Sequence, residues 1–269
     1  MHVKPQIELL AVSKGVEHEM GPQDISAFGA FGCFEEQSAL GLFKSTPADK
    51  RPKKVEVVLR ESAGRGHGSV ADQNCFTFSI ENLTRAATLQ LCLPHYLAHL
   101  QQSLRRATAD RGFYLPDSIK DSSLFEDAKQ TLSDSFKTYD KLSEKGVPKE
   151  DARFLLPLYT KTNIQTSGNA RELMHLRMMN KQGEVPTAVS HVVDTMIAQA
   201  SEKDPHLFND WGYNYETLAW YPSAQFYSSE NKTANEIIKK YKQPEATVYF
   251  EHEMSEDAVR KAVKERNET

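Results

Sequence analysis

The sequence predicts an α/β (α+β) protein in which long helices pack against a mixed sheet. Strand-like apolar segments alternate with segments of helical periodicity, and one helical pattern runs unbroken over 123–145. The 269 residues are 39% hydrophobic, which is enough to bury a substantial core. We expect one main domain over 1–227 and an appendage over 228–269, where the composition becomes charged and polar.

Short apolar segments predict the strands, which cover Gln6 to Val12, Cys75 to Ile80 and Lys161 to Thr166. Apolar residues at helical spacing predict helices at 21–33, 55–62, 83–91, 123–145, 149–156, 169–179 and 186–200. The polar segment 44–54 holds two prolines and is predicted to be a loop.

Glycine, proline and capping residues set the expected helix ends. Gly146 ends the long helix, and Pro94 predicts a break near Leu93 because proline removes a helix hydrogen bond. Ser69 to Asp72 and Asn169 to Glu172 have the form of capping boxes, so we expect a helix to begin at each.

Charge and composition exclude several classes of partner. A net charge of −4 and a pI near 6.2 give no basic face for a nucleic acid. The longest apolar stretch, Phe154 to Tyr159, is too short to span a bilayer, and the first residues lack a signal-peptide core, so we expect a cytoplasmic protein. The odd number of cysteines without C-x-x-C spacing predicts buried small hydrophobes at Cys33, Cys75 and Cys92.

The segment from Gln101 to Arg105 is a candidate ligand site. If it is extended, Gln101, Ser103 and Arg105 share one face and offer an amide, a hydroxyl and a guanidinium, with Gln102 between them. That set suits a phosphate or a pyrimidine edge. The alternative is an exposed polar strand.

Arginines elsewhere predict sites for anions. Arg153 lies beside an apolar run and needs an anionic partner, either a ligand or its neighbours Glu150 and Asp151. Arg171 follows Asn169 at a predicted helix start, which favours a phosphate or pyrophosphate cradle, although Asn169 alone explains a cap.

Histidines complete the candidate set. His67 precedes Ser69 at a predicted helix start, and His175 lies one turn after Arg171 with Arg177 beyond it. His95 and His99 have i,i+4 spacing, but no H-E-x-x-H pattern or nearby acidic ligand accompanies them, so we predict no metal site.

The order of these segments resembles the flavin-dependent thymidylate synthase family from about Val55 to Glu184, roughly half the chain. The family's G-H-x-S-x-x-E-H and F-T-F segments are similar to Gly66-His67-Gly68-Ser69-Val70-Ala71-Asp72-Gln73 and Phe76-Thr77-Phe78. Its S-R-A segment ending in glutamine resembles Thr84-Arg85-Ala86 and Gln90, and its A-R-x-x-L-P, N-x-R and L-R elements resemble Ala152 to Pro157, Asn169 to Arg171 and Leu176-Arg177.

The signature R-H-R-x-x-S-x-N-E-x-S-x-R-Y is matched only in its second half. Leu93, Pro94 and His95 stand at its first three positions, while Ser103 and Arg105 are retained and Arg106 replaces the tyrosine. Two lost charged hydrogen bonds, at roughly 1.5–3 kcal/mol each, would weaken flavin binding by roughly a hundredfold to ten-thousandfold.

The resemblance implies reductive C5 methylation of deoxyuridylate (dUMP) or a related pyrimidine nucleotide by a homotetramer. FAD is the implied cofactor, with NADPH and methylenetetrahydrofolate as co-substrates. The residues implied to bind the nucleotide are Gln90, Gln101, Gln102, Ser103, Arg105, Arg153 and Arg177, with catalytic roles for Arg177 and Ser103. The residues implied to bind the flavin are His67, Ser69, Asp72, His95, Asn169, Arg171 and His175. Two alternatives stay open: a non-catalytic nucleotide-binding paralogue, and an enzyme acting on another pyrimidine nucleotide.

Overall fold

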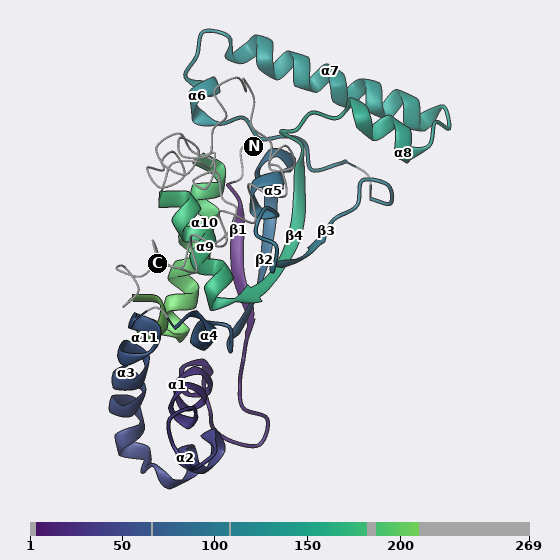
Figure 1. The fold of residues 1–269 in the computed structure, drawn as a ribbon. Coiled ribbons are helices and arrows are strands. Elements are labelled where there is room, and N and C mark those ends of the chain that lie inside the picture. Colours follow the sequence, from purple (N-terminus) through teal and green to yellow (C-terminus); the bar gives the residue numbers. More distant parts are fainter. Residues whose placement is uncertain (1–3, 66, 108, 182–186, 210–269) are drawn as a thin grey trace, which may run out of the picture. The chain divides into compact units, whose positions relative to one another are not determined.

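A computed structural model describes residues 4–65, 67–107, 109–181 and 187–209. The predicted appendage over 228–269 lies outside these residues, so the domain boundary stays a prediction. Within the described part, helices pack against one four-stranded sheet, and the expected combination of helices and sheet is confirmed (Figure 1).

The sheet has the strand order β1-β2-β4-β3, and each neighbouring pair is antiparallel, so these strands do not form the mixed sheet that was expected. Three of its strands were predicted, and the structure lengthens two of them. The strands are β1 (Gln6–Val12), β2 (Cys75–Thr84), β3 (Ala98–Gln101) and β4 (Lys161–Asn169).

The two faces of the sheet differ because side chains alternate along each strand. Phe76, Phe78 and Ile80 of β2 are fully buried, as is Thr166 of β4. Helices α9 (Ala170–Lys181) and α10 (Thr187–Lys203) pack on this side, together with α5 (Arg85–Leu91) (Figure 1). The opposite face carries polar side chains and is left open by the described residues of the chain.

A second group of helices packs on α9, α10 and one another near the start of β2. Its members are α1 (Pro22–Gly32), α2 (Ala39–Ser45), α3 (Arg51–Glu61), α4 (Gly68–Ala71) and α11 (Pro205–Asn209), with 3-10 turns η1 (Ala48–Lys50) and η2 (Ala63–Arg65). Phe28 and Phe43 hold α1 and α2 together, with ring centroids 5.3 Å apart at an angle of 89°. The prediction of a loop over 44–54 was wrong at its C-terminal end, because Pro52 lies in the first turn of α3, where proline is tolerated.

A helical arm built around α7 (Phe125–Glu144) also includes α6 (Asp117–Lys120), α8 (Lys149–Ala152) and the 3-10 turn η3 (Arg153–Leu155) (Figure 1). The long helix ends as predicted, since Gly146 adopts a φ of +82° that favours glycine. Leu104, Ala109, Tyr139 and Ala152 form a small separate core that fixes the arm to the loop after β3.

Three local expectations were wrong. Ser69 lies inside α4 instead of capping it, because the helix begins two residues earlier than expected, with His67 as its N-cap. The extended segment ends at Gln101, since Leu104 turns into the small core. Cys33, Cys75 and Cys92 are exposed, because each lies at the end of a helix or strand, where the core does not cover it.

Candidate functional site

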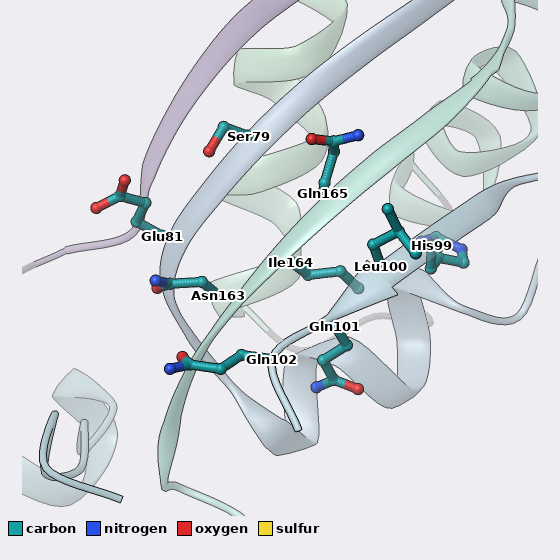
Figure 2. Close-up of a pocket in the computed structure, with 9 residues that line it drawn as sticks. All are labelled: Ser79, Glu81, His99, Leu100, Gln101, Gln102, Asn163, Ile164 and Gln165. Carbon is teal, nitrogen blue, oxygen red and sulfur yellow. The ribbon is translucent and has the colours of Figure 1, made fainter. Parts of the chain in front are cut away.

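A polar hollow of about 590 Å³ lies on the open face of the sheet (Figure 2). Its lining comes from β2, β3 and β4 and consists of Ser79, Glu81, His99, Leu100, Gln101, Gln102, Asn163, Ile164 and Gln165. Four of these nine residues carry amide side chains, a group that offers both donors and acceptors. Two of the predicted substrate residues, Gln101 and Gln102, are among them.

Hydrogen bonds to neighbouring elements fix the end of β3. Gln101 donates through Nε2 to Thr88 Oγ1 on α5 at 2.9 Å. The main-chain nitrogen of Gln102 donates to the oxygen of Asn163 on β4, also at 2.9 Å. Gln90 also lies on α5, two residues after Thr88, a spacing that puts the two side chains on different faces of the helix.

The chain turns directly after this strand end. Ser103 Oγ accepts a hydrogen bond from the main-chain nitrogen of Arg105 at 3.2 Å. Leu104 is buried in the small core, while Arg105 and Arg106 are exposed on the turn. Ser103 and Arg105 therefore lie together as predicted, although on a turn and not on one face of a strand.

Arg85 joins this cluster, although no sequence pattern predicted a role for it. Its Nη2 donates to the main-chain oxygen of Gln102 at 2.7 Å. Its Nε is buried and has no hydrogen-bond partner among the described residues. Burial lowers the pKa of Arg85, and the nearby charge of Arg153 lowers it further.

Arg153 contributes a second guanidinium from η3. Its Nε donates to the main-chain oxygen of Glu150 at 3.1 Å, and its Cζ lies 5.1 Å from the Phe154 ring centroid. No carboxylate in the described part of the chain forms an ion pair with Arg85, Arg105 or Arg153, so pairing with Glu150 or Asp151 is wrong. Since Arg85 and Arg153 repel each other, an anion between them would stabilise both.

A second cluster forms where α4 meets α9. Asp72 accepts from Asn169 Nδ2 at 3.3 Å and from Arg171 Nη1 at 3.1 Å. Asn169 also caps α9, because its Oδ1 accepts from the main-chain nitrogen of Glu172 at 2.9 Å. The structure thus brings three predicted flavin ligands together, and exposed His67 and Ser69 lie on the adjacent short helix.

The other predicted residues lie on separate elements. His175 is buried on α9 with its Nδ1 3.4 Å from Glu172 Oε1. Arg177 Nη1 donates to the main-chain oxygen of Phe208 at 3.3 Å. His95 is exposed in the turn after α5. Arg177 lies on α9, whereas Arg153 lies in η3, which packs on α7 and α8.

Neither histidine of the i,i+4 pair belongs to a recognisable metal centre. His99 Nδ1 lies 3.0 Å from Thr166 Oγ1, and burial lowers the pKa of its ring. The described ranges contain no group of three or more His, Cys, Asp or Glu residues arranged to hold a metal ion. The same ranges contain no helix that is both long and apolar enough to cross a membrane.

A family model described as thymidylate synthase complementing protein, Thy1, matches residues 16–206. The chain belongs to the Thy1 family. This confirms the family that the sequence resembles, and the match extends well beyond the motifs that first indicated it.

Relatives named flavin-dependent thymidylate synthase support this assignment. The protein from Pyrococcus furiosus is 33% identical over 156 residues, which cover 56% of this chain and 64% of that protein, slightly under two thirds of its length. The protein from Saccharolobus solfataricus is 30% identical over 199 residues, which cover 72% of this chain and 74% of that protein.

A solved structure shares the fold. The crystal structure of a UMP/dUMP methylase, PolB, from Streptomyces cacaoi bound with 5-Br dUMP has a TM-score of 0.64 and 16% sequence identity. The structural match covers 78% of this chain and 95% of the PolB chain. At this identity the likeness concerns the fold alone and not the individual site residues.

Proposed function

We propose that this Thy1 protein methylates C5 of dUMP or a related uridine nucleotide in a flavin-dependent reaction. The observation that carries the proposal is the arginine cluster beside Gln101 and Ser103, which holds positive charge without a carboxylate partner among the described residues. A nucleotide phosphate supplies the missing charge, and bidentate guanidinium contacts suit it.

In this account Arg85, Arg105 and Arg153 bind the phosphate, while Ser103 adds a hydroxyl. Gln90, Gln101 and Gln102 present amides for the sugar and the uracil edge, because an amide both donates and accepts. Arg177 polarises the uracil from a neighbouring subunit.

The cluster of Asp72, Asn169 and Arg171 is proposed to hold FAD. Arg171 Nε is buried without a partner among the described residues, so one donor remains for a phosphate oxygen even while Nη1 bonds Asp72. His67, Ser69, His95 and His175 complete the proposed flavin surroundings. When bound, reduced flavin supplies the reducing equivalent, NADPH regenerates it, and methylenetetrahydrofolate supplies the carbon.

One observation favours a second candidate function. Leu93 and Pro94 occupy positions where the family signature has arginine and histidine, and neither side chain can donate a hydrogen bond. A nucleotide-binding paralogue without flavin chemistry would tolerate both residues. The two functions differ in whether the purified protein takes up FAD and forms a methylated product.

A homotetramer with sites shared between subunits is also proposed, because Arg153 lies in η3, which packs on α7 and α8, while Arg177 lies on α9, which packs on β4 and α10. Arg153→Ala and Arg177→Ala should each be inactive alone. Refolding the two variants together should restore part of the activity, since some sites then combine an intact half from each subunit. Light scattering should give about four chains per particle.

A matched mixture of two Arg153→Ala preparations serves as the control and should stay inactive. If mixing the two different variants restores nothing although mixed tetramers form, the two arginines belong to the same half-site. A monomer that still binds nucleotide would contradict the shared-site arrangement altogether.

A further inference from the structure

A buried carboxyl group lies at the junction of β2 and α11. Asp204 is completely buried between the end of α10 and the start of α11. Its Oδ1 accepts from the main-chain nitrogen of Leu207 at 3.3 Å, which caps α11, and Oδ2 accepts from Asn74 Nδ2. Asn74 is itself 1% exposed and lies immediately before β2. One carboxyl group therefore fastens two segments that are 130 residues apart.

Each of these segments lies next to residues that are proposed to bind a ligand. Asn74 lies two residues after Asp72, which holds Asn169 and Arg171. On the other side, α11 provides the Phe208 oxygen that accepts from Arg177. Phe208 also packs edge-to-face on Phe76 of β2, with ring centroids 5.4 Å apart, so the junction is a single packed unit.

We propose that Asp204 is a positioning residue that holds the Asp72 turn and the Arg177 contact in register. It touches neither proposed ligand and acts through Asn74 and α11. The functional part of this inference rests on the proposed function, whereas the structural part concerns the junction alone.

The proton on Asp204 is expected to control this junction. Burial raises the pKa of Asp204 to about 7, and the carboxylate of Asp24 on α1 acts in the same direction, against the hydrogen bonds from Leu207 and Asn74. Other charged groups on the surrounding elements are Lys203 at the end of α10, His206 on α11, Glu56 on α3 and Arg177 on α9.

The sign follows from comparing the two states. An unfolded Asp loses its proton near 3.8, whereas the folded one keeps it to about 7. The folded state therefore binds the extra proton between these values, and its stability falls as pH rises through that window and levels off above 7. The folding constant should fall by up to about a thousandfold for this group, because the shift spans about three pH units.

Hydrogen exchange of the full-length protein from pH 5.5 to 8 tests the junction, with protection factors corrected for chemical exchange. Protection at 71–76 and 203–209 should fall as pH rises. Asp204→Asn should remove that fall while keeping the fold, because asparagine is also a good helix cap. Asp140→Asn, on the exposed face of α7, is the matched control and should behave like the native protein. Equal pH dependence in the native protein and Asp204→Asn would overturn the proposal.

FAD titration over the same range tests the functional part. Affinity should weaken as pH rises toward 7 in the native protein, level off above that value, and stay level throughout in Asp204→Asn. If protection changes as expected but both proteins show the same FAD profile, the positioning role is overturned. If neither protein binds FAD, the proposed flavin chemistry fails, and hydrogen exchange still decides whether Asp204 controls the junction.

Discussion

Replacing Arg153 or Arg105 with alanine should weaken dUMP binding by about tenfold to a hundredfold. Each change removes a charge-assisted hydrogen bond to the phosphate, at roughly 1.5–3 kcal/mol. The loss at Arg153 should be the larger of the two, because Arg153 is half-buried beside Arg85 while Arg105 is exposed to solvent. Isothermal titration calorimetry on the purified variants measures both effects.

Two controls distinguish the contribution of the phosphate contacts to dUMP binding from that of other contacts. Arg60→Ala changes an exposed arginine on α3 that pairs with Glu56 and Glu61, and it should leave dUMP affinity unaltered. Deoxyuridine lacks the phosphate, so its weaker binding should be the same in the native protein and in Arg153→Ala. Unchanged dUMP affinity in both Arg105→Ala and Arg153→Ala would show that the phosphate lies elsewhere.

The double change Leu93→Arg with Pro94→His should tighten FAD binding by about a hundredfold to ten-thousandfold. It restores two charged or polar donors at roughly 1.5–3 kcal/mol each. Leu93 is 51% exposed in the turn after α5, so an arginine fits there without disturbing the core. Absorbance and fluorescence titrations measure the affinity, and we expect the native protein to be pale and to take up FAD at micromolar concentrations.

Leu89→Arg is the matched control, because it adds the same charge at an exposed position on α5. It should leave FAD affinity near the native value, since Leu89 lies outside the signature. An equal gain in Leu89→Arg would mean that general positive charge, and not the restored contacts, attracts the flavin. Absence of any spectral change in the native protein and in the double variant would favour the nucleotide-binding paralogue.

Much of the fold could be predicted from apolar patterns. Strands β1, β2 and β4 and the long helix α7 follow from local periodicity, which is strong in these segments. Strand β3 was not predicted, because it has only four residues and carries His99 and Gln101, and the extended segment was expected after it, over 101–105. An edge strand of this kind depends on pairing with β4, and a local pattern does not reveal such pairing.

The candidate site, too, could be predicted only in part, because its geometry depends on tertiary contacts. The predicted cluster of Ser103 and Arg105 exists, but its shape depends on Leu104 packing near Tyr139, far along the chain. The role of Arg85 depends on its bond to the Gln102 oxygen, which is a tertiary contact. The sequence did hold a signal for Asp204, because an aspartate before Pro205 is typical of a helix start. The sequence around Asp204 did not predict its complete burial, because that burial depends on tertiary packing.

Product analysis tests the central proposal most directly. The purified protein is incubated with dUMP, FAD, NADPH and methylenetetrahydrofolate, and the nucleotide is examined by mass spectrometry. We predict a product heavier by one CH2 group, formed by the native protein and lost in Arg153→Ala. A protein that binds dUMP but forms no such product, either natively or with Leu93→Arg and Pro94→His, would contradict the proposed methylation.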